Sequence, residues 1–312
     1  MAYLNPFIGQ GAILAKMDRR RLSYLYAGLA VLFWSTIPTA FKIGLGELDV
    51  LTMLTIATVV STITLSGIVI ITGKLDLILK STRNELITSA LLGLINPFLY
   101  YIILLKAYKL LPAQVAQPLN MIWPIILVFL SVPVLKQKIP GKSFFALFIS
   151  FIGVYIISSQ GNILHPGKSD PLGVILATGS SVFWALYFIF SMKDKRDESV
   201  KLLTNFIFAT VYLVAAIIVL RRDNAPVSLK GVTASVYVGM FEMGMTFYFW
   251  LKALQLAPTS DKVSNLVYLA PFISLIFVHF IIKEPVYYTT PAGLLLIITG
   301  IFIQNRRSNN GV

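Results

Sequence analysis

The sequence has 312 residues, of which 57% are hydrophobic and only 12% are charged. Soluble globular proteins have about 45–50% apolar and about 25% charged residues, so a soluble fold of this size would lack the polar side chains to cover its surface. The composition excludes an ordinary cytosolic enzyme, a disordered chain and a nucleic-acid-binding module. With two histidines and no cysteine, the sequence predicts no metal site, and it also predicts no cofactor.

Long apolar stretches follow one another along the whole chain. Nine of them contain no charged residue and have at least 19 residues each: 22–41, 50–73, 86–105, 110–135, 143–167, 171–192, 202–220, 263–282 and 285–305. A tenth, 231–251, carries one acid, Glu242. About 20 apolar residues cross the ~30 Å hydrocarbon core of a bilayer as an α-helix. The sequence therefore predicts an all-α integral membrane protein with ten transmembrane helices.

The basic residues indicate how these helices are threaded. If the N-terminus is cytoplasmic, 18 of the 26 lysines and arginines fall on cytoplasmic segments and 8 on outer loops. Cytoplasmic loops of membrane proteins carry such an excess, so both termini are predicted to lie in the cytoplasm. The net charge of +13 is assigned to this topology and to anionic lipid of a plasma membrane, with no nucleic-acid partner.

The two halves of the chain are similar to each other. Four features recur in the same order at offsets of 146 to 150 residues. They are Phe33-Trp34 and Phe183-Trp184, the Lys-Ala pairs that begin at Lys106 and Lys252 with a proline six residues after each lysine, Gly93 and Gly239, and Gly153 and Gly300. One such pair could arise from composition alone, but four in order predict a duplicated unit of five helices.

A unit of five helices ends on the opposite side of the membrane from its start. The second copy must therefore run in the opposite sense, as in the inverted-topology repeats of many secondary transporters, whose substrate site lies near the middle of the membrane between the copies. The predicted organisation is a cytoplasmic N-terminal segment (1–21), a first repeat (22–159), a connecting loop (160–170), a second repeat (171–306) and a cytoplasmic tail (307–312).

These features resemble the drug/metabolite transporter superfamily and, within it, the EamA-type permeases. The likeness covers roughly residues 20–306 and rests on the Phe-Trp pairs, the Lys-Ala pairs with their prolines, and the glycines of the fifth and tenth helices. It implies export of amino acids or related metabolites. In this family an acidic residue often follows the fourth and ninth helices. Glu284 fits that pattern in the second copy, whereas the first copy has Lys136-Gln137-Lys138.

Glu242 lies in the middle of a predicted helix, at the repeat position of Asn96. Ionisable side chains within a membrane are costly and mark substrate or ion pathways. Glu242 is therefore predicted to bind a substrate amine or to couple transport to protons. The alternative is a structural acid that is neutral or paired with a lysine.

The other predicted substrate contacts are amide or aromatic side chains. Gln114 and Gln117 lie one turn apart at the start of the fourth helix, where free N–H groups suit a carboxylate. Trp34 and Trp184 fall in the middle of their helices and not at the headgroup level, so as a repeat-related pair they are predicted to wall a cavity. Helix capping and core packing are the alternatives. The remaining members of the predicted set are Asn96, Tyr100 and Tyr268.

Lys106 and Lys252 close the third and eighth helices, one on each side of the membrane. Lysines at such positions usually extend to the interface. The functional alternative is gating, or recognition of a carboxylate or phosphate. Ala146, Ser150 and Gly153 on the fifth helix let backbones approach closely, which predicts tight helix packing or the face of a homodimer.

The sequence thus favours a secondary transporter that exports a small metabolite, first of all amino acids or similar zwitterions, by alternating access through a midplane cavity. A carrier of phosphorylated or nucleotide-linked metabolites is the second interpretation. A passive channel is disfavoured because a channel needs a continuous pore lined by rings of charge or carbonyl groups. An intramembrane enzyme needs paired acids, a Ser/His pair or metal ligands, so no catalytic residue is predicted.

Overall fold

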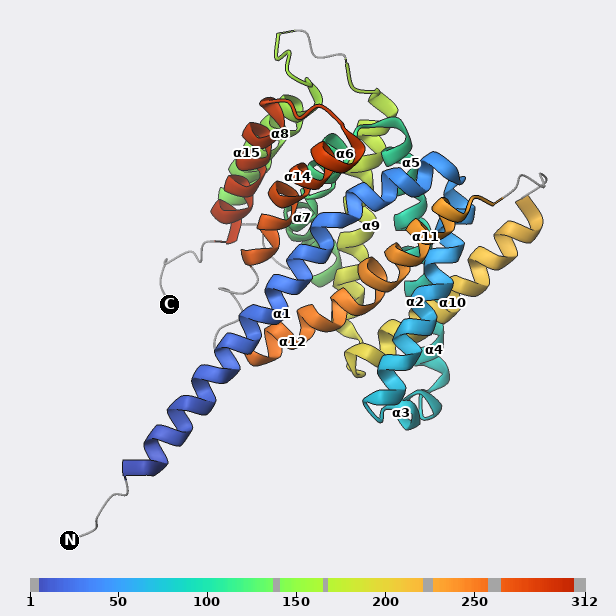
Figure 1. Cartoon of the computed structure of the whole chain (residues 1–312), viewed down its shortest axis with the longest axis vertical. Helices are drawn as coiled ribbons and strands as arrows, with labels where there is room; N and C mark the ends of the chain where they lie inside the picture. The colour runs from blue at the N-terminus through green and yellow to red at the C-terminus, as the bar shows by residue number, and fades with distance from the viewer. Residues whose placement is uncertain (1–5, 137–140, 165–167, 221–226, 258–264, 306–312) are drawn as a thin grey trace.

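The computed structural model describes residues 6–136, 141–164, 168–220, 227–257 and 265–305. Within them the chain is all-helical, as predicted (Figure 1). Seven of the described helical stretches are long and apolar enough to cross a membrane: Arg19–Glu47, Val50–Ile71, Arg83–Leu110, Ala113–Val134, Gly141–Ser158, Pro171–Lys193 and Glu198–Leu220. Two shorter apolar helices are Leu266–Ile282 and Thr289–Ile303. The count of ten membrane helices and the cytoplasmic location of the termini stay predictions.

The first half of the chain is a series of helices joined by short turns. They are α1 (Pro6–Glu47), α2 (Val50–Ile71), α3 (Leu75–Leu79), α4 (Arg83–Gly93), the π-helical η1 (Leu94–Leu99), α5 (Tyr100–Leu110), α6 (Ala113–Asn120), α7 (Trp123–Leu135) and α8 (Gly141–Ser158). Local sequence determines where several of them begin. The Asp49 carboxylate accepts hydrogen bonds from the backbone N–H groups at the start of α2, and Thr82 and Glu85 form a capping box at α4.

The second half repeats this series. It contains α9 (Pro171–Lys193), α10 (Glu198–Leu220), α11 (Leu229–Tyr237), the π-helical η2 (Val238–Met245), α12 (Thr246–Leu256), η3 (Asn265–Leu269), α14 (Ala270–Ile282) and α15 (Thr289–Asn305). The π-helical segments interrupt the third and eighth predicted helices at corresponding places. α7 and α14 both end on a lysine in the left-handed region, Lys136 with φ 54° and Lys283 with φ 56°. Local geometry therefore follows the repeat.

Helices of the two halves pack in reciprocal pairs. α8 lies along its counterpart α15, and α2 lies along its counterpart α10 (Figure 1). α1 packs on α12 and α14, whereas its counterpart α9 packs on α5 and α7. At one α2–α10 contact the hydroxyl oxygens of Thr62 and Thr210 lie 2.9 Å apart, and these residues are themselves counterparts. Each contact thus recurs with the halves exchanged, as a two-fold relation between the repeats produces.

Glycine is required where the third and eighth predicted helices cross their neighbours. A Cβ atom on Gly93 would lie 2.3 Å from the carbonyl oxygen of Asn205, and a Cβ atom on Gly239 would lie 2.3 Å from the carbonyl oxygen of Ala57. Asn205 and Ala57 are repeat counterparts as well. The backbones touch at both crossings, so a side chain there would push the repeats apart.

The small residues of α8 pack against α15 within the chain. A Cβ atom on Gly153 would lie 2.6 Å from the carbonyl oxygen of Gly293, and the reverse distance is 2.5 Å. Ala146 and Ser150 are buried in the same contact region. These residues therefore serve tight packing between helices, which is one of their two predicted roles. Because they are buried within the chain, they do not form a face for a second copy. The homodimer stays a prediction.

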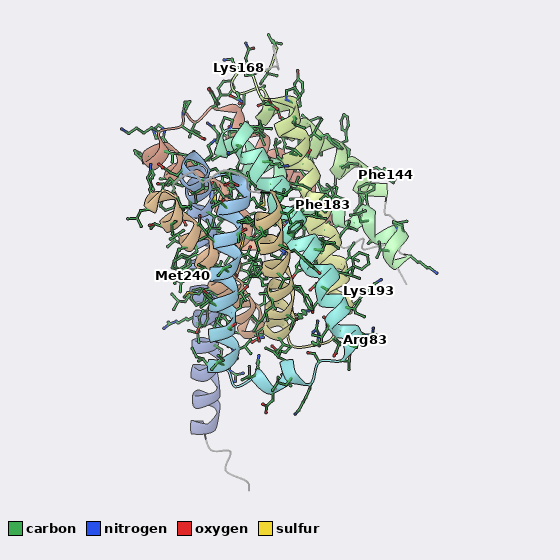
Figure 2. All side chains as sticks on the ribbon, turned by 90° about the vertical axis from the view of Figure 1, so that its right-hand side faces the viewer. Arg83, Phe144, Lys168, Phe183, Lys193 and Met240 are labelled. Carbon is green, nitrogen blue, oxygen red and sulfur yellow. The ribbon has the colours of Figure 1, made fainter. Side chains whose placement is uncertain are left out.

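The helix bundle has two ends, and a lysine marks each of them. Figure 2 shows Lys168, just before α9, at one end, and Arg83 and Lys193 toward the other. The N-terminal part of α1 extends beyond the bundle on the side of Lys193 (Figures 1 and 2). These are called the Lys168 end and the Lys193 end below.

Candidate functional site

A cavity of about 530 Å³ lies between the two repeats. Helices of both contribute to its walls: α1, α5, α6 and α7 from the first, and α9, α10, η2, α12, η3 and α14 from the second. Ligand sites in proteins have volumes of about 300–1,000 Å³, so the cavity can hold a small organic molecule. The sequence-predicted contacts that line it are Trp34, Tyr100, Gln117, Trp184, Glu242 and Tyr268.

The walls of the cavity are strongly aromatic. All four tryptophans of the sequence line it: Trp34, Trp123, Trp184 and Trp250. Phe247 lies between the repeat-related pair, with its ring centroid 6.0 Å from that of Trp34 and 6.1 Å from that of Trp184. The Trp34 and Trp250 centroids are 5.3 Å apart. Each indole is half-buried, because one side faces the cavity.

Glu242 lies in the π-helical segment η2, and its carboxylate accepts a hydrogen bond of 2.9 Å from the buried Tyr101 hydroxyl on α5. Segments of this kind often occur at functional sites, since they break the regular helix ladder. Asn96, the counterpart of Glu242, lies in η1, but it is 2% exposed and does not line the cavity. At this pair of corresponding positions, the second repeat therefore has an acid in the cavity wall, and the first repeat has a buried amide outside it.

Polar groups of the cavity wall are bonded across helices. The Tyr100 hydroxyl donates to Oδ1 of Asn120 at 3.2 Å, and Nδ2 of Asn120 donates to the Ser180 hydroxyl on α9 at 2.8 Å. Oε1 of Gln117 accepts a hydrogen bond from Ser274 on α14. These bonds hold the second half of α6 against the second repeat, and the side-chain amides of both Gln117 and Asn120 are part of the cavity wall.

At the Lys168 end the cavity is closed by aromatic and charged contacts. The rings of Phe41 and Tyr108 line the cavity and lie 5.1 Å apart. Just beyond them, Nζ of Lys42 donates to the carbonyl oxygens of Tyr108 and Leu111, both at 3.1 Å. The end of α5 is thereby held against α1.

A second set of contacts, called the latch here, consists of Lys42, Ala113, Gln114 and Glu284. Oε1 of Glu284 lies 3.7 Å from Nζ of Lys42, and Oε2 accepts the N–H of Ala113, the first residue of α6, at 2.8 Å. Burial raises the pKa of Glu284, and the charge of Lys42 and the N–H of Ala113 only partly offset this effect. The acid that the resemblance singled out thus ties the second repeat to the first.

Gln114 belongs to the latch and not to the cavity. It is 1% exposed, and its side chain donates to the carbonyl oxygen of Pro285 and accepts from the N–H of Tyr287 and the hydroxyl of Thr290. The predicted contact with substrate therefore has no support from its position. Its role is to fasten the start of α6 to the segment between α14 and α15.

The Lys193 end of the cavity reaches the surface. Glu198 and Lys201, one turn apart at the start of α10, both line the cavity. The Glu198 side chain is 52% exposed, whereas that of Lys201 is 5% exposed. Nζ of Lys201 lies 2.6 Å from Oε1 of Glu198 and donates to the carbonyl oxygen of Ser191 at 3.1 Å.

The two ends differ because the repeats carry different side chains there. Residues at the Lys193 end that correspond by the repeat offsets are smaller or uncharged: Ser191 for Phe41, Met192 for Lys42, and Leu254 for Tyr108. All three line the cavity. The closure at the Lys168 end therefore has no equivalent among the described residues of the other end.

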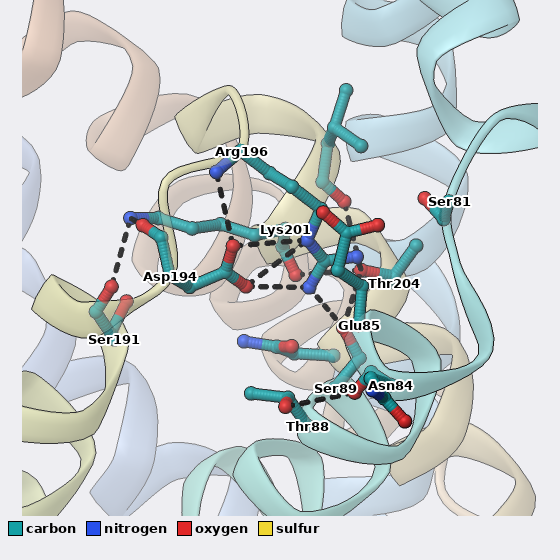
Figure 3. A network of polar contacts seen from close by, with 12 residues as sticks. Ser81, Asn84, Glu85, Thr88, Ser89, Ser191, Asp194, Arg196, Lys201 and Thr204 are labelled. Atoms are coloured by element: carbon teal, nitrogen blue, oxygen red, sulfur yellow. Dashed lines mark hydrogen bonds and ion pairs between the residues drawn. The ribbon is translucent and has the colours of Figure 1, made fainter.

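The segment between α9 and α10 is held by an interior ion pair (Figure 3). Nη2 of Arg196 lies 2.6 Å from Oδ2 of Asp194 and also donates to the Ser89 hydroxyl on α4 at 2.6 Å. The Asp194 and Arg196 side chains are 4% and 8% exposed. Burial acts to raise the pKa of Asp194, but the hydrogen bonds and charge of Arg196 hold it below its ordinary value. This cluster fixes the start of α10, which carries Lys201.

Neither predicted gating lysine lines the cavity. Lys106 is exposed on α5, and Nζ of Lys252 lies 5.6 Å from the ring centroid of Tyr248. The charged residues at the ends of the cavity are instead Lys42, Glu198 and Lys201. All three lie outside the uncharged stretches, so the sequence analysis used the two lysines for topology alone and did not use Glu198. The signal that could have revealed the last two is their opposite charge at a spacing of one helical turn.

Residues 21–159 and 171–306 each match the EamA-like transporter family. The chain belongs to this family. The predicted resemblance is thereby confirmed, and so is the arrangement as two repeats. This EamA-like transporter is accordingly a multi-pass protein of the lipid bilayer, and its substrates are small molecules.

Relatives of this EamA-like transporter are similar along most of the chain. An uncharacterized transporter of Clostridium kluyveri is 24% identical over 298 residues, which cover 92% of this chain and 95% of the relative. The uncharacterized transporter YvbV of Bacillus subtilis is 27% identical over 235 residues, or 74% of each chain. One solved crystal structure superposes with a TM-score of 0.64 at 18% identity, over 91% of this chain and 96% of the other. That likeness shows the shared fold.

Proposed function

We propose that this EamA-like transporter is a secondary transporter that exports a small metabolite with an amino group by alternating access. Amino acids and similar zwitterions are the first class to consider. The observation that carries the proposal is the cavity between the repeats, which has the exposed Glu198 in its wall at one end and the buried Phe41 and Tyr108, with the latch beyond them, at the other. A site open to one side at a time is what alternating access requires.

Glu242 is the proposed contact for the amino group and the proposed coupling residue. A carboxylate in the wall of a cavity attracts a substrate cation, and it can take up a proton when the substrate leaves. Substrate and proton would then use the same group in turn, which couples export to proton entry. The hydrogen bond from the Tyr101 hydroxyl orients the carboxylate.

The Lys193 end is the proposed cytoplasmic side, because the basic segments that favour the cytoplasm belong to it. The conformation described here would then load substrate from the cytoplasm of a cell whose plasma membrane holds the protein. Release would follow when the latch opens and the smaller side chains of the Lys193 end come together. The two repeats would exchange their roles in this step.

A carrier of phosphorylated or nucleotide-linked metabolites is the second candidate. Such substrates carry two or more negative charges and need free cations in the site. Among the described residues of the cavity, Lys201 is the cation, and Glu198 already neutralises it. The charges around the cavity therefore favour an amine over a phosphate.

Counterflow in proteoliposomes tests the proposed function. Vesicles loaded with an unlabelled amino acid should take up the labelled form transiently above equilibrium, because exchange requires an alternating site. Glu242→Gln should abolish this overshoot, whereas Asp76→Asn, which changes an exposed acid on α3 in the same way, should leave it intact. Uptake without an overshoot for any substrate would indicate a channel and contradict the proposal.

A further inference from the structure

The charged residues that line the cavity suit the ammonium group of a zwitterion better than its carboxylate. Three charged side chains line it among the described residues: Glu198, Lys201 and Glu242. Lys201 is bonded to Glu198 at 2.6 Å and to the Ser191 carbonyl oxygen, so its positive charge is already neutralised. A substrate carboxylate would have to displace Glu198 before it could bind there.

Glu242 has the opposite situation. Its carboxylate accepts a hydrogen bond from the Tyr101 hydroxyl, an uncharged donor, and no lysine or arginine forms an ion pair with it in the described part of the chain. Glu242 is half-buried and lines the same cavity as the tryptophans. The middle of the cavity therefore carries one negative charge that a ligand can neutralise.

The aromatic walls reinforce this preference. A ring face attracts a cation through its quadrupole, and the effect increases when water is excluded. Trp34 and Trp184 flank Phe247 on two sides, and the Tyr100 ring lies 5.0 Å from that of Trp184. An apolar body bound in the cavity would lie against these rings, and Glu242 in the same cavity would neutralise its positive charge.

We infer that the cavity recognises organic monocations, namely primary or quaternary ammonium compounds with an aromatic or extended apolar body, in preference to zwitterions or anions with the same body. The inference rests on the proposed function and narrows its substrate class. Glu242 neutralises the cation, and the aromatic rings hold the body. Because Glu198 already occupies Lys201, a zwitterion with the same body binds more weakly than the cation.

Ligands that share one body and differ in charge test the inference. We would titrate the purified, intact chain with phenethylamine, phenyltrimethylammonium, phenylalanine and 3-phenylpropionate, and follow tryptophan fluorescence and thermal stability. Both cations should bind about tenfold or more tightly than phenylalanine, because phenylalanine carries the same ammonium group but its carboxylate would lose water without gaining a free cation. 3-Phenylpropionate should not bind. Binding of phenylalanine or 3-phenylpropionate as tight as that of phenethylamine would overturn the inference.

Two variants connect the preference to the named residues. Glu242→Gln should abolish binding of both cations, and the acidic control Asp76→Asn should not change it. Glu198→Gln should free Lys201 and raise the affinity for phenylalanine. If Glu242→Gln still bound phenethylamine, the inference would be wrong. The ligand series on the unaltered chain decides the matter even if Glu242→Gln does not fold.

Different experimental results would contradict this inference and the proposed function. If amino acids give a counterflow overshoot while phenethylamine neither binds nor competes, the inference is overturned and the transporter function stands. If phenethylamine binds and depends on Glu242 while no substrate gives counterflow, the inference stands and the proposed transport cycle is overturned.

Discussion

Asp194 and Arg196 form the ion pair that holds the start of α10, and the pair should make stability depend on pH. The pKa of Asp194 is lowered in the folded state. The stabilisation is therefore fully present above the ordinary pKa of an aspartate, about 4, and is lost as the pH falls through the lowered value. This direction follows because acid protonates Asp194 more readily in the unfolded chain than in the folded one.

Asp194→Asn should therefore destabilise the protein by about 3 kcal/mol at pH 7, because it leaves an interior arginine without its charged partner. Below about pH 4 the difference from the unaltered chain should shrink. Thermal unfolding in detergent at pH 7 and at pH 3.5 measures both effects. Asp76→Asn serves as the control and should change the stability by less than ~0.5 kcal/mol. An equal loss for Asp194→Asn at both pH values would contradict the assignment.

For single residues, the sequence predicted some of those that line the cavity and missed others, while their contact with substrate stays a prediction. Trp34, Trp184 and Glu242 could be predicted because an indole or an acid in mid-membrane is unusual. Gln114 was assigned to substrate because its spacing from Gln117 fits one helix face, but spacing does not say that the face meets a neighbouring loop. Lys201 was missed because a lysine at the start of a helix is ordinary until its burial is known.

Glycines at the helix crossings give a prediction about elements. Gly93→Ala would put a Cβ atom 2.3 Å from the Asn205 carbonyl oxygen on α10, which cannot move without shifting the helix. We expect a loss of about 1–3 kcal/mol, the usual cost of overpacking. In Gly67→Ala, on α2, the added atom has no neighbour within 4 Å, and the better helix propensity of alanine should leave the stability unchanged or raised by up to about 1 kcal/mol.

Thermal unfolding of the two glycine variants, measured side by side in the same detergent, separates packing from propensity. If Gly93→Ala were as stable as Gly67→Ala, the close crossing of the third predicted helix with α10 would be wrong. The corresponding substitution Gly239→Ala should behave like Gly93→Ala, because its Cβ atom meets the Ala57 carbonyl oxygen at the same distance.

The positions of the helices could be predicted from the sequence, but the changes in hydrogen-bond pattern within them could not. The apolar stretches 86–105 and 231–251 correspond to helices, yet each contains a π-helical segment, η1 or η2. Hydropathy reports the length of a helix and is silent on a change in its hydrogen-bond ladder. The stretch 263–282 begins with the short η3 before α14, within the residues that the structure describes there. The break places Tyr268 in the cavity wall.

For the whole molecule, the absence of cysteine gives a clean test of topology. Single cysteines at Asn84 and Lys195, both exposed toward the Lys193 end, should react with a membrane-impermeant maleimide only in inside-out vesicles. Single cysteines at Lys168 and Lys230 are exposed and should react in intact cells. Reaction of Lys168→Cys and Lys195→Cys from the same face would contradict the inverted repeat, since α9 must cross the membrane between them.

The duplicated architecture was the most predictable property of the molecule, because it rests on four ordered pairs of motifs that a family match now supports. The direction in which the cavity opens could not be predicted. It depends on how the side chains at corresponding positions, such as Phe41 and Ser191 or Lys42 and Met192, meet other residues in space. Sequence similarity between the repeats suggests equal ends, and the side chains make them unequal.

Labelling of one cavity residue from both faces tests the central claim, a substrate cavity that opens to one side at a time. Met121→Cys would place a single thiol in the cavity wall. We expect it to react with an impermeant maleimide in inside-out vesicles and little in intact cells. Adding Glu284→Gln, which weakens the latch, should raise labelling in intact cells roughly threefold, the effect of about 0.7 kcal/mol, and lower it in vesicles. Equal labelling from both faces that Glu284→Gln does not change would contradict the claim.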